Sequence, residues 1–275
     1  MSVHALGEEA AKPAEKGKES APAEASKLKP GELLRWEFPE HPPSLWTLTL
    51  GRQIEVEHPP TVSVQLPENY SSDRDFPLLL FMGGAWGDPG RRPKPAEQLV
   101  GLQDFILVSI PLFLSELERI EPDEANKWSR LYIGSIEGDY LWQLWKPMLE
   151  KVFAEVPNID RKRTFIGGFS NGANATAAVL NDPEGREWML QHFSHFVLVE
   201  GGKELKPDKD LSEKSFLLIN GQKSGDWLRP LAETLITLPS ERTTYRIMPE
   251  VGHEFPDEEK TRAAKWIRDQ AKVSK

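Results

Sequence analysis

Hydrophobic and polar positions along the chain follow two patterns, which predict strands interleaved with helices. Residues 76–82 (FPLLLFM) and 104–113 are continuous apolar runs, typical of strands that are buried on both faces of a parallel sheet. Apolar and polar residues alternate over 47–56 and 62–66, which predicts half-buried strands near the start of the domain. A short helix is expected over 95–101, as the crossover between the two buried strands.

The strongest helical pattern covers residues 139–156 and ends at Pro157. Its apolar residues recur at spacings of three and four and form one stripe: Leu141, Leu144, Trp145, Met148, Leu149, Val152, Phe153 and Val156. We expect this stripe, together with Trp142, in the core. Further strands are predicted over 195–202, 215–222 and 241–248, and further helices over 226–238 and 256–273.

This order of strands and helices predicts an α/β fold with a mostly parallel central sheet covered by helices on both faces. In such sheets, reactive groups gather at the carboxyl ends of the strands. Residues 1–30 are rich in Ala, Glu, Lys and Pro and have little to bury, so we expect a disordered tail before a single domain over 31–275. Residues 114–136 are polar and irregular, and loops of that length are often functional.

Charge and composition narrow the function classes. The 275-residue chain has a formal net charge of −9, which argues against nucleic-acid binding, because such binding requires a cationic surface. The absence of cysteine excludes disulfides and a thiol nucleophile. No apolar run reaches the roughly 20 residues of a membrane-spanning helix. We therefore expect a soluble protein, either cytoplasmic or exported with its signal segment absent from this chain, and the oligomeric state stays open.

Residues 163–180 carry the clearest sign of chemistry. An apolar run stops at Gly168-Phe169-Ser170-Asn171-Gly172 and continues as an Ala-rich segment, which predicts a strand, a sharp turn and a helix. In that setting the serine of a G-x-S-x-G pattern becomes a nucleophile, because the turn pushes its hydroxyl out of the sheet. The bare pattern also arises by chance in some chains of this length. Its place between a strand and a helix makes Ser170 the candidate nucleophile.

A serine nucleophile requires a base, usually a histidine that a carboxylate orients. His253 lies between the last predicted strand and the last predicted helix, where its ring could reach Ser170. The carboxylate is expected after a late strand, and Asp226 is the first choice, with Glu200 at the end of the preceding strand as the alternative. Both have simpler interpretations. Asp226 could be an ordinary helix cap, and Glu200 could bind backbone amides in its Gly-Gly turn.

Backbone amides for an oxyanion hole are expected at two places. Asn171 follows the candidate nucleophile at the start of a helix, where amide groups favour an anion. Gly84 and Ala85 follow the buried strand 76–82, where glycine lets the backbone approach a ligand.

Aromatic side chains also lie near predicted strand ends. Trp86, Trp128 and Trp227 could form a platform for a sugar or phenolic ring, although tryptophans also fill gaps in a core. Gly84, Trp86 and Trp227 are therefore the candidate substrate-binding residues.

Four segments together resemble a known family. They are TVSVQLPENY (61–70), FPLLLFMGGAWG (76–87), GGFSNGANA (167–175) and VGHEFP (251–256). Over residues 45–272 the chain resembles the α/β-hydrolase superfamily, in the esterase branch that includes polyhydroxyalkanoate depolymerases and feruloyl or acetylxylan esterases.

The resemblance implies a role for each candidate residue: Ser170 as nucleophile, His253 as base, Asp226 as acid, and Ala85 with Asn171 as the oxyanion hole. The chain departs from the family pattern at two positions. Met82 stands where a histidine usually precedes the oxyanion glycines, and Ser224 stands where the acid commonly lies, two residues before Asp226.

The predicted function is a serine hydrolase that cleaves carboxylic esters through a Ser-His-Asp triad and an acyl-enzyme. We expect a small-molecule or carbohydrate-linked ester as substrate. No cofactor or metal is expected, because the zinc-peptidase, P-loop and dinucleotide-binding motifs do not occur in the sequence. Two alternatives stay open: a peptidase of the same fold, and a non-catalytic binding protein whose triad is incomplete, which the displaced acid suggests.

Overall fold

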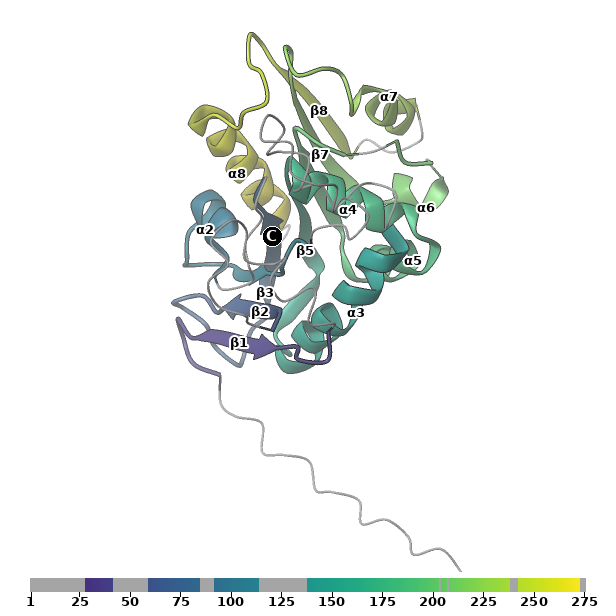
Figure 1. The fold of residues 1–275 in the computed structure, drawn as a ribbon. Helices are drawn as coiled ribbons and strands as arrows, with labels where there is room; N and C mark the ends of the chain where they lie inside the picture. Colours follow the sequence, from purple (N-terminus) through teal and green to yellow (C-terminus); the bar gives the residue numbers. More distant parts are fainter. Residues whose placement is uncertain are drawn as a thin grey trace, which may run out of the picture.

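A computed structural model describes residues 28–41, 59–84, 92–113, 138–202, 204–206, 208–237 and 242–272. Within these ranges, eight strands form one sheet in the order β1-β2-β4-β3-β5-β6-β7-β8 (Figure 1). They are β1 Leu33–Glu37, β2 Thr61–Gln65, β3 Phe76–Met82, β4 Ile106–Ser109, β5 Ile159–Phe169, β6 His195–Val199, β7 Ser215–Gly221 and β8 Thr243–Met248. Residues 1–27 of the predicted tail, the strand predicted over 47–56 and the loop over 114–136 lie outside the described residues.

The sheet is mostly parallel, as the continuous apolar runs predict. β2 pairs antiparallel with β1 and β4, whereas every other neighbouring pair is parallel. Every residue of β3 and of β7 is buried, because helices cover both faces of the sheet. The carboxyl ends of the parallel strands therefore meet at one edge, where such folds place their reactive groups.

Helices cover the two faces of the sheet in separate groups. The helices are α2 Lys94–Val100, α3 Gly138–Glu155, α4 Asn171–Asn181, α5 Pro183–His192, α6 Lys209–Ser212, α7 Arg229–Thr237 and α8 Asp257–Ala271. α2 and α8 pack together on one face, and α3, α4 and α5 pack together on the other (Figure 1). The predicted fold class is confirmed. None of the described helices has the length and apolar character required to cross a membrane.

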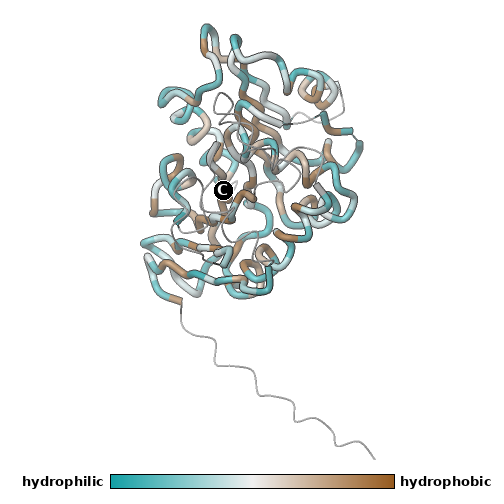
Figure 2. The backbone as a smooth tube through the Cα atoms, viewed as in Figure 1, coloured by the Kyte–Doolittle hydropathy of each residue, from teal (hydrophilic) through white to brown (hydrophobic). Residues whose placement is uncertain are grey.

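Successive residues of the central strands point to opposite faces and supply two cores. Leu80 of β3 belongs to the larger core, under α3, α4 and α5, and Phe81 belongs to the smaller core, under α2 and α8. Trp142 and Trp145 lie in the larger core and are almost fully buried, as expected. In Figure 2, hydrophobic brown is concentrated in the central strands and hydrophilic teal on the outer helices and loops.

β4 is shorter than the strand predicted over 104–113. Of the predicted strand, only residues 106–109 pair with β2 or β3, although the apolar residues on either side of them are buried too. Pro111, which has no N–H to donate to a ladder, lies just beyond the paired part, and its carbonyl accepts a hydrogen bond from Trp145 Nε1 at 3.0 Å. An apolar run therefore reports burial here rather than strand pairing.

Three elements, β1, α5 and α6, were not predicted from the sequence. The start of α5 has a readable signal, because Asp182 accepts a hydrogen bond from the N–H of Gly185 at 2.7 Å and Pro183 occupies the first turn. Leu28, in the last part of the predicted tail, packs against the larger core.

His195 opens β6 and is a buried titratable group. It is 7% exposed and stacks on Phe165 with 4.3 Å between ring centroids. Burial lowers the pKa of His195 to about 4, and the charges of Arg242 and Lys214 act in the same direction, against the hydrogen bond to the carbonyl of Thr164. The folded chain therefore resists protonation of this histidine.

We predict that acid destabilises the fold through His195. Below about pH 6.5 the unfolded chain binds a proton on this histidine, whereas the folded chain does not until about pH 4. The penalty is thus absent above pH 6.5, grows as the pH falls toward 4, and amounts to about 2 kcal/mol at pH 5. Urea unfolding at pH 7.5 and pH 5.0 measures it. Between these two values the free energy of unfolding should fall by about 2 kcal/mol less in His195→Asn than in the wild type, and equal falls would contradict this account.

Candidate active site

Ser170 sits at a sharp turn between β5 and α4, as the sequence predicts. Its φ of 53° lies in the left-handed region, which non-glycine residues seldom adopt. The turn is held on both sides: the N–H of Ser170 donates to the carbonyl of Val199 on β6 at 2.8 Å, and its carbonyl accepts from the N–H of Asn174 at 2.9 Å. The backbone thereby directs the hydroxyl away from the sheet.

The flanking glycines of the motif are required by close packing. A Cβ atom on Gly168 would lie 2.7 Å from the backbone of Gly172 and from the carbonyl oxygen of Met82. A Cβ atom on Gly172 would lie 2.7 Å from the Cβ of Met82. Helix α4 can therefore approach β3 this closely only because both positions are glycine.

His253 lies in the loop between β8 and α8, and its ring meets Ser170. His253 Nε2 and Ser170 Oγ are 2.8 Å apart. The ring packs beside Phe169 and Trp227, with 5.3 Å and 6.1 Å between centroids, and Phe255 stacks on Phe169 at 6.2 Å. The imidazole is thus positioned by its aromatic neighbours, yet its side chain is 45% exposed and open to a substrate.

Glu200 is the carboxylate that the structure brings to His253. Its Oε2 atom lies 3.2 Å from His253 Nδ1, and its Oε1 atom accepts a hydrogen bond from the backbone N–H of Gly221. Its side chain is 1% exposed, so these oxygens are shielded from water. A carboxylate acceptor at Nδ1 assigns the proton to that nitrogen and leaves Nε2 to accept from the hydroxyl of Ser170.

Glu200 also has an unusual backbone conformation. It directly follows β6 and has a φ of 51°. Among the residues that the structure describes, three non-glycine residues have a positive φ, and Ser170 and Glu200 are two of them. Such conformations cluster at functional sites, where the surrounding structure holds them in place.

The expected placement of Asp226 against His253 is wrong. The carboxylate of Asp226 lies in a solvent-exposed ion pair with Arg229, with 2.9 Å between Oδ2 and Nη1. Asp226 lies shortly before α7, where the guanidinium in the first turn of that helix attracts it. Glu200, the alternative acid, occupies the position beside the imidazole.

Gly84 and Asn171 border the candidate nucleophile. A Cβ atom on Gly84 would lie 3.0 Å from the Cβ of Ser170, so the end of β3 packs directly against the turn. Asn171 is the first residue of α4.

Ala85, Trp86 and Trp128 lie outside the described residues. Trp227 is 53% exposed and lies beside His253.

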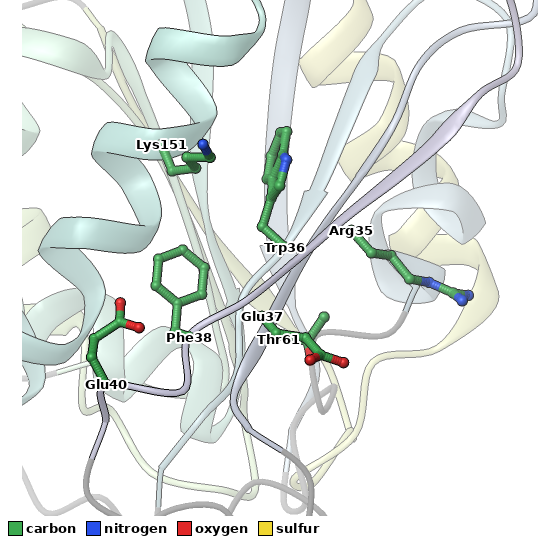
Figure 3. A pocket seen from close by; sticks show the side chains of 7 residues that line it. All are labelled: Arg35, Trp36, Glu37, Phe38, Glu40, Thr61 and Lys151. Carbon is green, nitrogen blue, oxygen red and sulfur yellow. The ribbon is translucent and has the colours of Figure 1, made fainter.

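No metal centre is suggested by the described parts of the chain, where no group of three His, Asp or Glu side chains could hold an ion. A separate hollow of about 1010 Å³ lies between β1 and α3. Figure 3 shows Trp36 and Phe38 of this hollow pointing toward the helix that carries Lys151. None of its lining residues belongs to the cluster of Ser170, His253 and Glu200, so it is not part of this site.

Comparisons with known proteins agree with this architecture. No family model matches the chain, and no curated protein does. Solved structures match, among them a thermostable esterase at 14% identity and a TM-score of 0.51, covering 88% of this chain and 63% of that one. A ferulic acid esterase from Anaeromyces mucronatus, in complex with ferulic acid, matches at 14% identity and a TM-score of 0.50, covering 90% of this chain and 93% of that one.

A thermophilic carboxylesterase cloned from a metagenomic library matches at 13% identity and a TM-score of 0.52, covering 90% of this chain and 92% of that one. The chain has the α/β-hydrolase fold. The fold expected from the sequence motifs is thereby confirmed, and the chain spans 63% of the length of the thermostable esterase. Within the α/β-hydrolase fold, the site lies at the carboxyl ends of β5, β6 and β8, where Ser170, Glu200 and His253 follow their strands.

Gly221 is a position where even a small change should disturb the site. A Cβ atom there would lie 2.9 Å from Glu200 Oε1 and would collide with the carbonyl of Gly252. Gly221→Ala should therefore lower the free energy of unfolding by about 1–3 kcal/mol. Gly252→Ala is the matched control: a Cβ atom there meets nothing within 4 Å, so its effect should stay within about 0.5 kcal/mol. Urea unfolding compares the two, and equal stabilities would contradict the packing described.

Proposed function

We propose that this protein is a serine hydrolase that cleaves carboxylic esters with a triad of Ser170, His253 and Glu200. The observation that carries the proposal is the hydrogen-bonded chain from hydroxyl to imidazole to carboxylate, with 2.8 Å and 3.2 Å between the paired atoms. A hydroxyl is a poor nucleophile until a base takes its proton, and a base is oriented best by a partner on its other nitrogen. The three side chains have this arrangement.

The proposed reaction has two halves. In the first, Ser170 Oγ attacks the acyl carbon while its proton moves to His253 Nε2, and Glu200 stabilises the imidazolium. The tetrahedral intermediate then collapses: the bond to the alcohol oxygen breaks, Nε2 returns the proton to that oxygen, and the acyl group stays on Ser170. In the second half, water repeats the attack through the same base, and the acid and free serine are released.

An oxyanion hole would lie between α4 and the end of β3. Asn171 is the first residue of α4, so its N–H lies at the end of the helix where the helix dipole favours a developing negative charge. The close packing of Gly84 against Ser170 supports a second donor from the following residue, Ala85. A single donor of this kind contributes on the order of 3–4 kcal/mol to catalysis.

The only reason to consider a non-catalytic binding protein was that the triad could lack its acid. The contact between Glu200 and His253 supplies a carboxylate at that position, so this reason no longer applies. A peptidase would use the same three side chains. No described feature favours an amide over an ester, so we keep ester hydrolysis as the proposal.

Ser170 is the residue on which turnover should depend most strongly. Ser170→Ala removes the attacking oxygen, so hydrolysis of p-nitrophenyl acetate and butyrate should fall at least about 10³-fold. Ser194→Ala is the matched control, because Ser194 lies at the opposite end of β6 and its hydroxyl donates to the carbonyl of Arg161. This control should keep the wild-type rate. Background rates for the wild type, equal to those of Ser170→Ala, would refute the proposed function.

Substitutions of the two carboxylates should have very different effects on turnover. In Glu200→Gln the amide oxygen can still accept from the N–H of Gly221, but the NH₂ group then faces His253 Nδ1 and imposes the wrong tautomer. The kcat for these esters should fall by about 10²–10⁴-fold. Asp226→Asn breaks only an exposed ion pair, so its kcat should stay within about twofold.

Thermal melts of both variants test whether they fold. If Asp226→Asn loses activity while Glu200→Gln keeps it, the role of the acid belongs to Asp226.

A further inference from the structure

Trp227 borders the site but takes no part in the reaction proposed above. Its side chain is 53% exposed, in contrast to Trp142 and Trp145, which are buried in the core. The indole lies beside the imidazole of His253, with 6.1 Å between ring centroids and 45° between the planes. Single exposed apolar residues are common on protein surfaces, so the position of this ring beside His253, rather than its exposure, marks it.

The chain on either side of Trp227 is anchored. Gly225 has a φ of 99°, which favours glycine, and a Cβ atom there would lie 3.0 Å from Trp227 Nε1. The carbonyl of Gly225 accepts a hydrogen bond at 3.1 Å from the side-chain amide of Asn220, which is 2% exposed. Leu228, on the other side, is fully buried. A ring presented by an anchored segment loses little freedom when it binds a ligand.

The proposed reaction determines which part of the ester lies near this ring. The acyl carbon must lie at Ser170 Oγ, and the carbonyl oxygen must point toward Asn171 and the end of β3. The leaving oxygen must then lie at His253 Nε2, because it takes the proton from that atom. A ring beside His253 therefore borders the alcohol part of the ester rather than the acyl part.

We propose that Trp227 is a specificity residue that binds the alcohol part of the ester, and that the preferred alcohols carry a ring, either aryl or sugar. This proposal rests on the proposed function. An indole face stacks on aromatic rings and on the apolar face of a sugar ring, whereas a flexible alkyl chain gains less from it. The preference should be worth about tenfold in kcat/KM.

The test compares esters that share an acyl group. Benzyl acetate and butyl acetate have similar leaving oxygens and differ in the ring, and 6-O-acetylglucose supplies the sugar arm. Trp227→Ala should lower the ratio of kcat/KM for benzyl acetate, or for the acetylated sugar, to that for butyl acetate by about tenfold. Trp227→Phe should restore the benzyl preference. Ile236→Ala is the matched control, because it truncates another exposed apolar side chain, 57% exposed on α7, and should leave both ratios unchanged.

If Trp227→Ala lowers kcat/KM equally for all three acetates, the ring has only a structural role and the proposal is overturned. If it instead lowers the preference for ethyl phenylacetate over ethyl butanoate, the ring binds the acyl part, which also overturns it. Turnover of butyl acetate that depends on Ser170 would leave the proposed function intact in both cases. If none of the esters shows such turnover, the proposed function fails together with this inference.

Discussion

Two neighbouring strand ends determine the geometry of the site. β5 and β6 pair in parallel, with Phe169 opposite Val199, so Ser170 and Glu200 leave the sheet side by side. Each continues the sheet by one hydrogen bond, because the N–H of Ser170 donates to Val199 and the N–H of Glu200 donates to Ile219, both at 2.8 Å. Their positive φ angles then turn both side chains out of the sheet, toward the same imidazole. Such backbone conformations cost on the order of 1–3 kcal/mol each, and the surrounding sheet compensates for this cost.

The buried carboxylate depends on the same arrangement. Glu200 is almost fully buried, and a buried carboxylate is tolerated only where hydrogen bonds replace those that it made to water. Its two oxygens bind His253 Nδ1 and the N–H of Gly221. The end of β7 must therefore carry no side chain, because a Cβ atom on Gly221 would occupy the space of the carboxylate. The glycines of this edge are thus part of the support of the site.

The sequence predicts much of this fold because its signals are local. Continuous apolar runs identified β3 and β4, and the strand-turn-helix pattern with a late histidine brought together Ser170 and His253, which the structure places in contact. The carboxylate could not be assigned in the same way. Glu200 and Asp226 both follow a late strand near glycines, and the choice depends on the φ of Glu200 and on the space beside Gly221. Strand register and close packing of this kind are set by tertiary contacts, which no local pattern encodes.

In the proposed function, the carboxylate of Glu200 orients His253 and thereby makes Ser170 nucleophilic. The rate of labelling by a fluorophosphonate measures this effect, because the reagent reports the reactivity of the hydroxyl whatever the natural substrate is. Peptide mass spectrometry should find the phosphonyl group on Ser170 in the wild type, with labelling strongly slowed in Glu200→Gln. A wild-type protein that stays unlabelled, or a Glu200→Gln variant labelled at the wild-type rate, would contradict the account.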